Sequence, residues 1–110
     1  MAEPTFQQIF GTGATQTATT ITIVKADLPG LTPAADNRAE PVFVGILLRA
    51  KSFLTPANQE ANSEQSITIT DPDFNADSLV QRNNQTYRQK TQSVNLQKLD
   101  TSTEIDPDDY

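Results

Sequence analysis

The sequence predicts a mainly β fold: a small antiparallel β-sandwich or barrel-like domain with extended N- and C-terminal arms. Residues 20–24 and 66–70 alternate polar side chains with isoleucine or valine, and β-branched residues with period two are typical of strands that have one apolar face. Residues 42–48 are apolar at nearly every position, which is typical of a central strand covered on both sides. Turn-forming Pro, Gly and Asn separate these segments.

Residues 42–48 are the best candidate for the core. On the strand interpretation, four side chains would face one side and three the other: Val42, Val44, Ile46 and Leu48 against Phe43, Gly45 and Leu47. A helix from Pro41 to Phe53 is the alternative. We favour the strand because Val, Phe and Ile crowd the segment and because Gly45 would weaken a helix interior by about 1 kcal/mol relative to alanine.

The chain divides into an N-terminal docking arm and connector at 1–19, a β domain at 20–99 and an acidic tail at 100–110. In the arm, apolar side chains three and four residues apart predict one short helical turn that Gly11 closes. Such a short helix is marginal alone, so its apolar stripe must pack either on its own domain or on a neighbouring subunit. Both alternatives stay open.

Two further elements follow the central segment. Thr55 and Pro56 predict a capped single helical turn or a surface loop. In the strand at 66–70, we expect Ile67 and Ile69 to lie opposite the isoleucines of 20–24 or beside the central strand.

The C-terminal third predicts a tight turn and a long strand. Asn83 and Asn84 suit a turn because asparagine tolerates the left-handed region. Residues 86–99 contain neither Pro nor Gly, which favours one long strand. Few of its side chains are apolar, so much of this strand is expected to be exposed or to meet a partner.

Composition indicates a core too small to stabilise the chain alone. Hydrophobic residues make up 35% and aromatic residues 6% of 110 residues, without Trp, Cys or His. At roughly 25 cal/mol per Å² of buried apolar surface against about 1.5 kcal/mol per ordered residue, the balance comes out near zero. Disulfides and the usual zinc sites cannot add stability. We therefore expect a homo-oligomer, or docking on other proteins.

Net charge and hydropathy exclude two classes of partner. The formal charge is -6, whereas nucleic-acid binding depends on clustered Lys and Arg. The longest apolar stretch, residues 42–48, is far shorter than the roughly 20 residues that span a bilayer. We expect neither nucleic acid nor membrane as a partner.

No catalytic set stands out. Without His and Cys the usual nucleophile and base pairs are missing, and Gly11-Thr12-Gly13 lacks the Lys of a phosphate-binding loop. Paired carboxylates occur beside prolines, but they lack the Gly and the distant Glu of a calcium loop, and we interpret them as turn and tail: Asp71 with Asp73, and Asp106 with Asp108 and Asp109. The sequence predicts no enzyme, no cofactor and no metal site.

Two stretches carry a resemblance. The first runs from Pro4-Thr5-Phe6 through Gly-Thr-Gly-Ala-Thr-Gln-Thr-Ala-Thr-Thr-Ile-Thr-Ile at 11–23, and the second from Gln-Thr-Tyr-Arg-Gln-Lys at 85–90 through Ile-Asp-Pro-Asp-Asp-Tyr at 105–110. Together they resemble small virion proteins of tailed phages that infect cyanobacteria, particularly capsid cement, or decoration, proteins. The resemblance implies assembly in the host cytoplasm and a place on the capsid surface, where such proteins form small oligomers and bridge adjacent major capsid proteins.

On this interpretation the arm at 1–11 and the strand at 86–99 make the contacts between subunits, with aromatic anchors dominating the energy. The expected interface residues are Phe6, Ile9, Phe10, Tyr87, Arg88, Lys90 and Tyr110. Two other roles remain open: a neck, tail or baseplate component, and a soluble module that binds an acidic or neutral small ligand through the face from Arg82 to Lys98.

Overall fold

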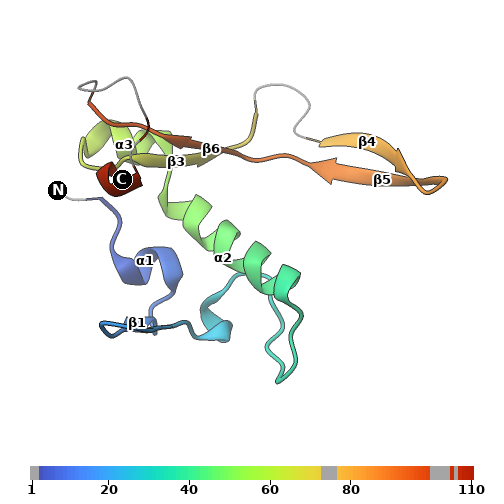
Figure 1. Cartoon of the computed structure of the whole chain (residues 1–110), viewed down its shortest axis with the longest axis horizontal. Helices are drawn as coiled ribbons and strands as arrows, with labels where there is room; N and C mark the ends of the chain where they lie inside the picture. The colour runs from blue at the N-terminus through green and yellow to red at the C-terminus, as the bar shows by residue number, and fades with distance from the viewer. Residues whose placement is uncertain (1–2, 73–76, 100–104, 106) are drawn as a thin grey trace.

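The computed structural model describes residues 3–72, 77–99, 105 and 107–110 (Figure 1). In this part of the chain the last α-helix ends at Ala61, and most of the strands follow it. In order, the elements are α1 (Phe6–Phe10), β1 (Thr15–Gln16), β2 (Ile21–Thr22), the 3-10 turn η1 (Lys25–Asp27), α2 (Ala39–Phe53), α3 (Pro56–Ala61), β3 (Ile67–Thr70), β4 (Asp77–Arg82), β5 (Gln85–Lys90), β6 (Ser93–Leu96) and the 3-10 turn η2 (Pro107–Asp109).

The fold is mixed, and within the described residues it contains small antiparallel sheets in place of the expected sandwich or barrel. The strands form three separate two-stranded sheets, β1–β2, β3–β6 and β4–β5. The expected strand at 20–24 is reduced to the two residues of β2, which pair with β1 and are exposed. The small antiparallel sheets agree with the prediction. The prediction that they combine into one sandwich or barrel was wrong.

The central segment is the main correction, because residues 42–48 lie inside helix α2 and form no strand. The helical alternative is confirmed. Gly45 is tolerated there for a packing reason: a Cβ on it would lie 3.1 Å from Cβ of Leu28, a side chain that is only 3% exposed. The helix propensity lost at Gly45 is therefore offset by the close approach and burial of Leu28.

Helix α1 packs against α2. The Thr5 hydroxyl accepts a hydrogen bond from the Gln8 amide, and the Gln8 side chain accepts one from the Thr5 amide, which completes a capping box. The helix ends at Gly11, whose φ of 123° favours glycine. Arg49 on α2 donates to the carbonyls of Gln7 at 3.1 Å and of Asp27 at 3.3 Å. One guanidinium thus fastens both α1 and η1 to α2.

Helix α3 confirms the capped turn expected at Thr55 and Pro56. The Thr55 hydroxyl accepts from the Asn58 amide, and Pro56 occupies the first helical turn. Buried amides fill the space between α3 and β3: Gln65 donates to the carbonyls of Thr55 at 3.1 Å and Ile67 at 2.8 Å and accepts from Asn58 at 2.6 Å. This part of the interior is polar, which compensates for the shortage of apolar side chains.

Strands β3 to β6 form one long hairpin with an interruption. Thr70 pairs with Ser93 and Asp77 pairs with Lys90, so six residues of the sequence separate β3 from β4, whereas two separate β5 from β6. The expected strand at 86–99 is therefore divided into β5 and β6. Ile67 pairs with Leu96, and Ile69 pairs with Val94. The prediction that these isoleucines lie opposite residues 20–24 or beside a central strand was wrong.

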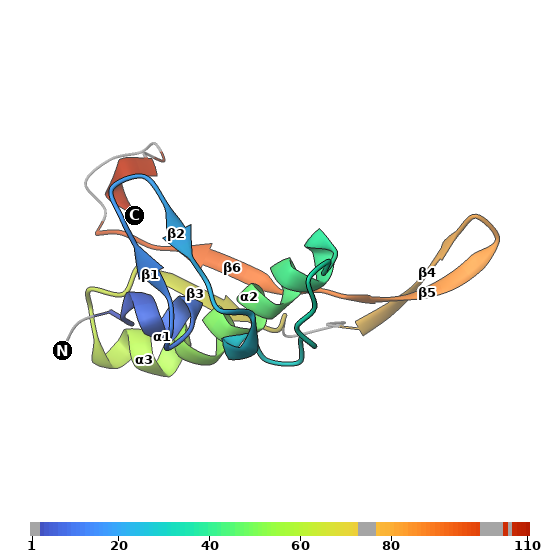
Figure 2. The same ribbon diagram turned by 90° about the horizontal axis from the view of Figure 1, so that it is seen from below.

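The turn between β4 and β5 confirms the expectation for Asn83 and Asn84, whose φ values are 53° and 62°. Two consecutive residues with positive φ make the mirror-image turn that matches strand twist in hairpins. The β4–β5 hairpin projects away from the helices in both views (Figures 1 and 2).

The molecule is extended for its size. Its radius of gyration is 16.6 Å, whereas about 13 Å is expected for a compact domain of this length. Four apolar side chains are buried among the described residues: Ala14, Leu28, Ala50 and Ile69. A core this small supports the helical body but leaves the projecting hairpin without an apolar layer.

Candidate interaction surface

The first part of the surface lies on α2. Gly45 lies against Leu28, and Arg49 donates to Gln7 and Asp27 of the body. Phe43, Val44 and Leu48 of the same helix are exposed, Phe43 by 66%. We name these three residues the α2 outer face. A helix that is apolar all round is normally covered on all sides, so α2 has a sequence suited to burial on both faces and is covered on one.

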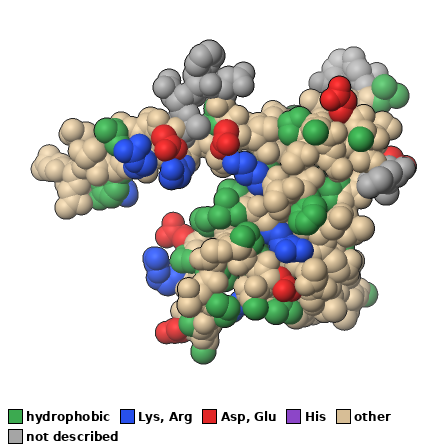
Figure 3. Space-filling model, turned by 180° about the vertical axis from the view of Figure 1, so that it is seen from behind, with side chains coloured by type: hydrophobic (Ala, Val, Ile, Leu, Met, Phe, Trp, Pro, Cys, Tyr) green, Lys and Arg blue, Asp and Glu red, His purple; other side chains and the backbone are tan. Residues whose placement is uncertain are grey.

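The α2 outer face borders an open recess. Val44, Leu48 and Lys51 are spaced four and three residues apart and so share one stripe of the helix, and Lys51 reaches the base of the hairpin. Figure 3 shows hydrophobic side chains beside the recess between the projecting hairpin and the body. On the helix itself, Val44 and Leu48 line a cavity of about 410 Å³ together with Pro29, Gly30 and Leu31 of the same chain.

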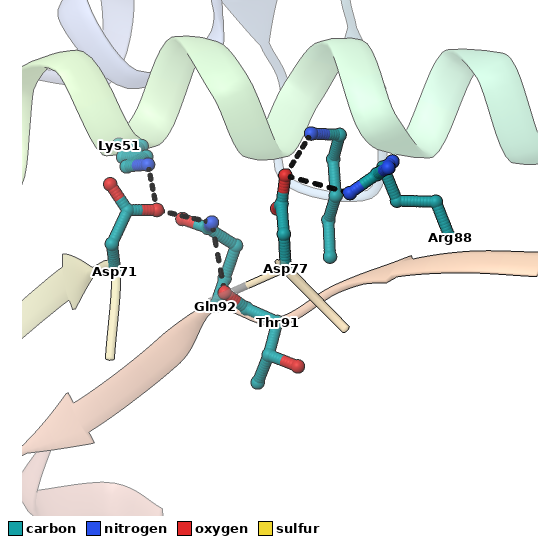
Figure 4. A network of polar contacts seen from close by, with 7 residues as sticks. Lys51, Asp71, Asp77, Arg88, Thr91 and Gln92 are labelled. Atoms are coloured by element: carbon teal, nitrogen blue, oxygen red, sulfur yellow. Dashed lines mark hydrogen bonds and ion pairs between the residues drawn. The ribbon is translucent and has the colours of Figure 1, made fainter. Parts of the chain in front are cut away.

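A polar network holds the base of the hairpin (Figure 4). Lys51 Nζ and Gln92 Nε2 both donate to Oδ1 of Asp71, at 2.9 Å and 2.6 Å. These two hydrogen bonds, the one from Lys51 first, hold the pKa of the Asp71 carboxyl below its usual range. The network joins α2, the residue after β3 and the residue before β6, so it helps to set the direction in which the hairpin leaves the body.

The two faces of the β4–β5 hairpin differ. On one, Tyr87 lies opposite Val80, and the Arg82 guanidinium lies 4.3 Å from the centre of the Tyr87 ring, a cation–π distance. On the other, Leu79 is 64% exposed and lies opposite Arg88. An isolated two-stranded hairpin is at best marginally stable in water, so contact of this hairpin with a partner stays a prediction.

Asp77 organises the charges on the second face. Its Oδ2 lies 3.0 Å from Nζ of Lys90 and 3.9 Å from Nη1 of Arg88. One carboxylate therefore stands beside two cations, and the hairpin keeps a net positive charge.

A second part of the surface lies at the C-terminal end of the body. Val94 and Leu96 on β6 and Tyr110 beyond η2 are exposed by about half, and we name them the β6 surface. Ile67, the partner of Leu96 in the sheet, lines a cavity of about 520 Å³ together with Tyr110 and Ile9. Apolar groups from three distant parts of the chain thus meet here.

The structure divides the interface residues predicted from the sequence into two groups. Phe6, Ile9 and Phe10 are half-buried in the body, with the two phenyl ring centres 4.9 Å apart, so this stripe packs at least partly on its own chain. Ile9 shares a cavity with Tyr110. Three others lie apart from these, on the exposed hairpin strand β5: Tyr87, Arg88 and Lys90. Their contact with a partner stays a prediction.

Sequence reasoning missed the α2 outer face and Leu79 as interface candidates. The signal was present, because residues 42–48 are apolar on every side. The strand interpretation placed Phe43 and Val44 in the core, whereas a helix with one covered face leaves them in solvent.

No group of three or more His, Cys, Asp or Glu residues gathers among the described residues, and Asp71 is engaged by Lys51 and Gln92. Asp73 and Asp106 lie outside the described residues. No helix in the described ranges is long and apolar enough to cross a membrane.

The basic residues proposed for a small ligand are also spread out. Arg82, Arg88 and Lys90 lie on the hairpin, whereas Lys98 follows β6 at the far end of the body. Comparisons with family models, curated proteins and solved structures found no match. The function is therefore argued from the geometry and the charges of the chain.

Proposed function

We propose that this chain is a virion structural protein that decorates and stabilises a phage capsid by bridging major capsid protein subunits, as a cement protein. The proposal combines the sequence resemblance of residues 4–23 and 85–110 with the exposed surfaces of the molecule. Its physical part is that the chain acts by burying apolar and backbone groups against protein neighbours, without a chemical step.

The observation that carries the proposal is the excess of accessible surface. The chain exposes 8451 Å², whereas a compact monomer of 12.0 kDa exposes about 6,000 Å². A standard interface buries about 800 Å² per partner, so the difference is large enough for contacts with more than one neighbour. A bridging protein needs such contacts.

The shape of the molecule supports bridging. Its extents are 48 × 36 × 25 Å, and the β4–β5 hairpin and the C-terminus lie toward opposite ends, with β6 between them (Figures 1 and 2). Two contacts at a distance from one another allow one small protein to hold two neighbours. We assign the β6 surface to the capsid shell because its three apolar side chains are exposed by about half. Tyr110 and Ile67, the sheet partner of Leu96, also line a cavity that an anchoring side chain of the shell would fill.

The experiment is co-sedimentation of the purified chain with capsid shells assembled without it. We expect the wild-type chain to bind and the double variant Val94→Thr with Leu96→Thr to lose binding by at least about tenfold, because exposed apolar anchors are removed while strand propensity is kept. Ile21→Thr is the matched control, since Ile21 is 58% exposed on β2. Shells that take up no wild-type chain, or that bind the double variant equally well, would contradict the proposal.

Labelling on intact particles separates this role from its nearest alternative. A cement protein is expected at many positions over the capsid surface. Label confined to the neck, tail or baseplate would assign the chain to that part of the particle and overturn the capsid role.

A further inference from the structure

The backbone of β6 has an outer edge that points away from β3. The Gln97 amide donates to the Ser66 carbonyl at 2.7 Å, one step beyond the pair of Ile67 with Leu96. Hydrogen-bonded pairs alternate with non-hydrogen-bonded pairs along an antiparallel ladder. The N–H and C=O groups of Val94 and Leu96 therefore point away from β3 and form this edge.

The two outer edges of the β3–β6 sheet differ. On the β3 side, the outward N–H of Ile69 donates to the Leu54 carbonyl at 2.9 Å. On the β6 side, no backbone hydrogen bond within the described part of the chain reaches Val94 or Leu96 from beyond the sheet. Both residues are also exposed by about half. The β3 edge is thus occupied by the chain itself, whereas the β6 edge is open.

The open edge lacks the features that normally prevent edge strands from pairing. Such edges are usually protected by charged side chains, especially Lys, or by Pro. Residues 91–97 contain no charged side chain and no Pro, whereas the neighbouring strand β5 carries Arg88 and Lys90. The backbone of β6 is therefore suited to pairing with a further antiparallel strand.

The edge of β6 is complementary to itself in one register. A twofold rotation about Asn95 places Val94 of one copy opposite Leu96 of the other, so each open N–H faces an open C=O. The neighbouring registers fit less well, because the chain runs from β5 into β6 without a turn (Figure 1). Centring on Val94 sets Lys90 opposite Lys98, and like charges directly opposite are destabilising. Centring on Leu96 sets Val94 opposite Lys98 and leaves Val94 without an apolar partner.

The register centred on Asn95 also continues the apolar rows of the sheet. Within one copy, Ile69 pairs with Val94 and Ile67 pairs with Leu96. With Val94 opposite Leu96 of the second copy, each row runs from an isoleucine of one copy through β6 of both copies to an isoleucine of the other. The half-exposed Val94 and Leu96 gain apolar neighbours on the side that is open in one copy.

We propose that two copies of this chain pair through their β6 edges, antiparallel and centred on Asn95, and so join their β3–β6 sheets into one continuous sheet. The partner is a second copy because the same edge supplies a donor or an acceptor for every open backbone group of Val94 and Leu96 and brings no charge opposite them. This inference goes beyond the proposed function, because it concerns contact between copies and is tested without a capsid. The pairing uses the backbone edge, and it leaves the β6 surfaces of the two copies side by side.

Disulfide formation tests the register. The chain contains no Cys, so Asn95→Cys introduces a single thiol at an exposed position. In the proposed pairing the two Cα atoms at this position lie about 4.5 Å apart, which a disulfide can span. Gln97→Cys is the matched control, because Gln97 is exposed on the same side of the extended chain. Its counterpart in the second copy lies about 14 Å away along the strand, at roughly 3.4 Å per residue.

We expect Asn95→Cys to form a linked dimer under mild oxidation at least about tenfold faster than Gln97→Cys, because only the former brings two thiols within reach. Equal rates for the two variants, or faster linkage through position 97, would overturn the proposed register.

Sedimentation velocity on the full chain tests the edge itself. Val94→Pro removes an N–H that the β3 ladder does not use, and proline is tolerated at such positions on edge strands. Val94→Ala shortens the same side chain but keeps the N–H. We expect the wild-type chain to form dimers and Val94→Pro to associate at least about tenfold more weakly than Val94→Ala, with β3 amides protected from exchange in both variants.

Two results would overturn the inference. Equal association of Val94→Pro and Val94→Ala would show that the backbone edge of β6 makes no contact between copies. A wild-type chain that stays monomeric at high micromolar concentration would exclude the second copy and leave a strand of another protein as the occupant of the edge.

Discussion

Lys51 on α2 and Asp71, the residue that follows β3, are joined by a hydrogen bond of 2.9 Å between Nζ and Oδ1. Gln92 donates to the same oxygen from the returning strand. This contact links the helical body to the base of the projecting hairpin.

The first prediction concerns the pH dependence of this contact. The pKa of Asp71 is lowered in the folded chain, so the contact contributes stability above the ordinary aspartate pKa of about 3.9 and loses it as the pH falls through the lowered value. A carboxyl-resolved NMR titration should give a midpoint below that of an unperturbed aspartate. Lys51→Met should move the midpoint up, whereas Lys98→Met should leave it in place. An Asp71 midpoint at the ordinary value would show that Lys51 and Gln92 do not stabilise the Asp71 carboxylate.

The second prediction compares two apolar residues, one beneath α2 and one on its outer face. Leu28→Ala should cost the isolated chain about 2–4 kcal/mol, because Leu28 is buried against Gly45. Phe43→Ala should change the free energy of unfolding by less than about 0.5 kcal/mol, because Phe43 is exposed. Urea denaturation of both variants at low concentration checks this. Similar losses for the two would mean that the outer face is covered within the chain.

The third prediction concerns the buried amide of Gln65. Gln65→Leu removes two hydrogen bonds to backbone carbonyls, to Thr55 and Ile67, and should destabilise the chain by about 2–3 kcal/mol because buried acceptors are left unpaired. Gln89→Leu is the control, since Gln89 is exposed on β5. Thermal melting compares the two. A neutral Gln65→Leu would show that water reaches these carbonyls.

The fourth prediction concerns the hairpin turn. Asn84 has a φ of 62°, so Asn84→Gly should strengthen the hairpin and Asn84→Ala should weaken it by about 1 kcal/mol, because a Cβ disfavours this conformation in alanine more than in asparagine. Amide exchange rates in β4 and β5 report the change. Exchange rates that do not respond to either substitution would place the stability of the hairpin elsewhere.

Local signals in the sequence predicted local structure well. Thr55 with Pro56 began a helix, Asn83 with Asn84 made the turn, and residues 67–70 formed a strand. Each of these depends on caps, turn chemistry or β-branched alternation within a few residues. Such preferences act before any tertiary contact is made.

The segments that sequence reasoning misjudged depend on distant partners. A continuous apolar run such as residues 42–48 fits a buried strand and a buried helix equally by periodicity, and the packing of Leu28 over Gly45 decided for the helix. Residues 20–24 carry strand-forming side chains, but only residues 15–16 pair with them. The error in residues 42–48 also affected the predicted interaction surface. A sandwich would bury Phe43 and Val44 in its core, whereas helix α2 leaves them exposed.

We propose that the hairpin and the α2 outer face become stable only against protein neighbours. Hydrogen exchange, residue by residue, in the dilute chain and in the assembled state tests this. We predict that β4 and β5 amides exchange nearly unprotected in the dilute chain while β3 is protected, and that β4, β5 and α2 gain protection of at least about tenfold on assembly. Protection of β4 and β5 equal to that of β3 in the dilute chain, or no gain on assembly, would contradict the claim.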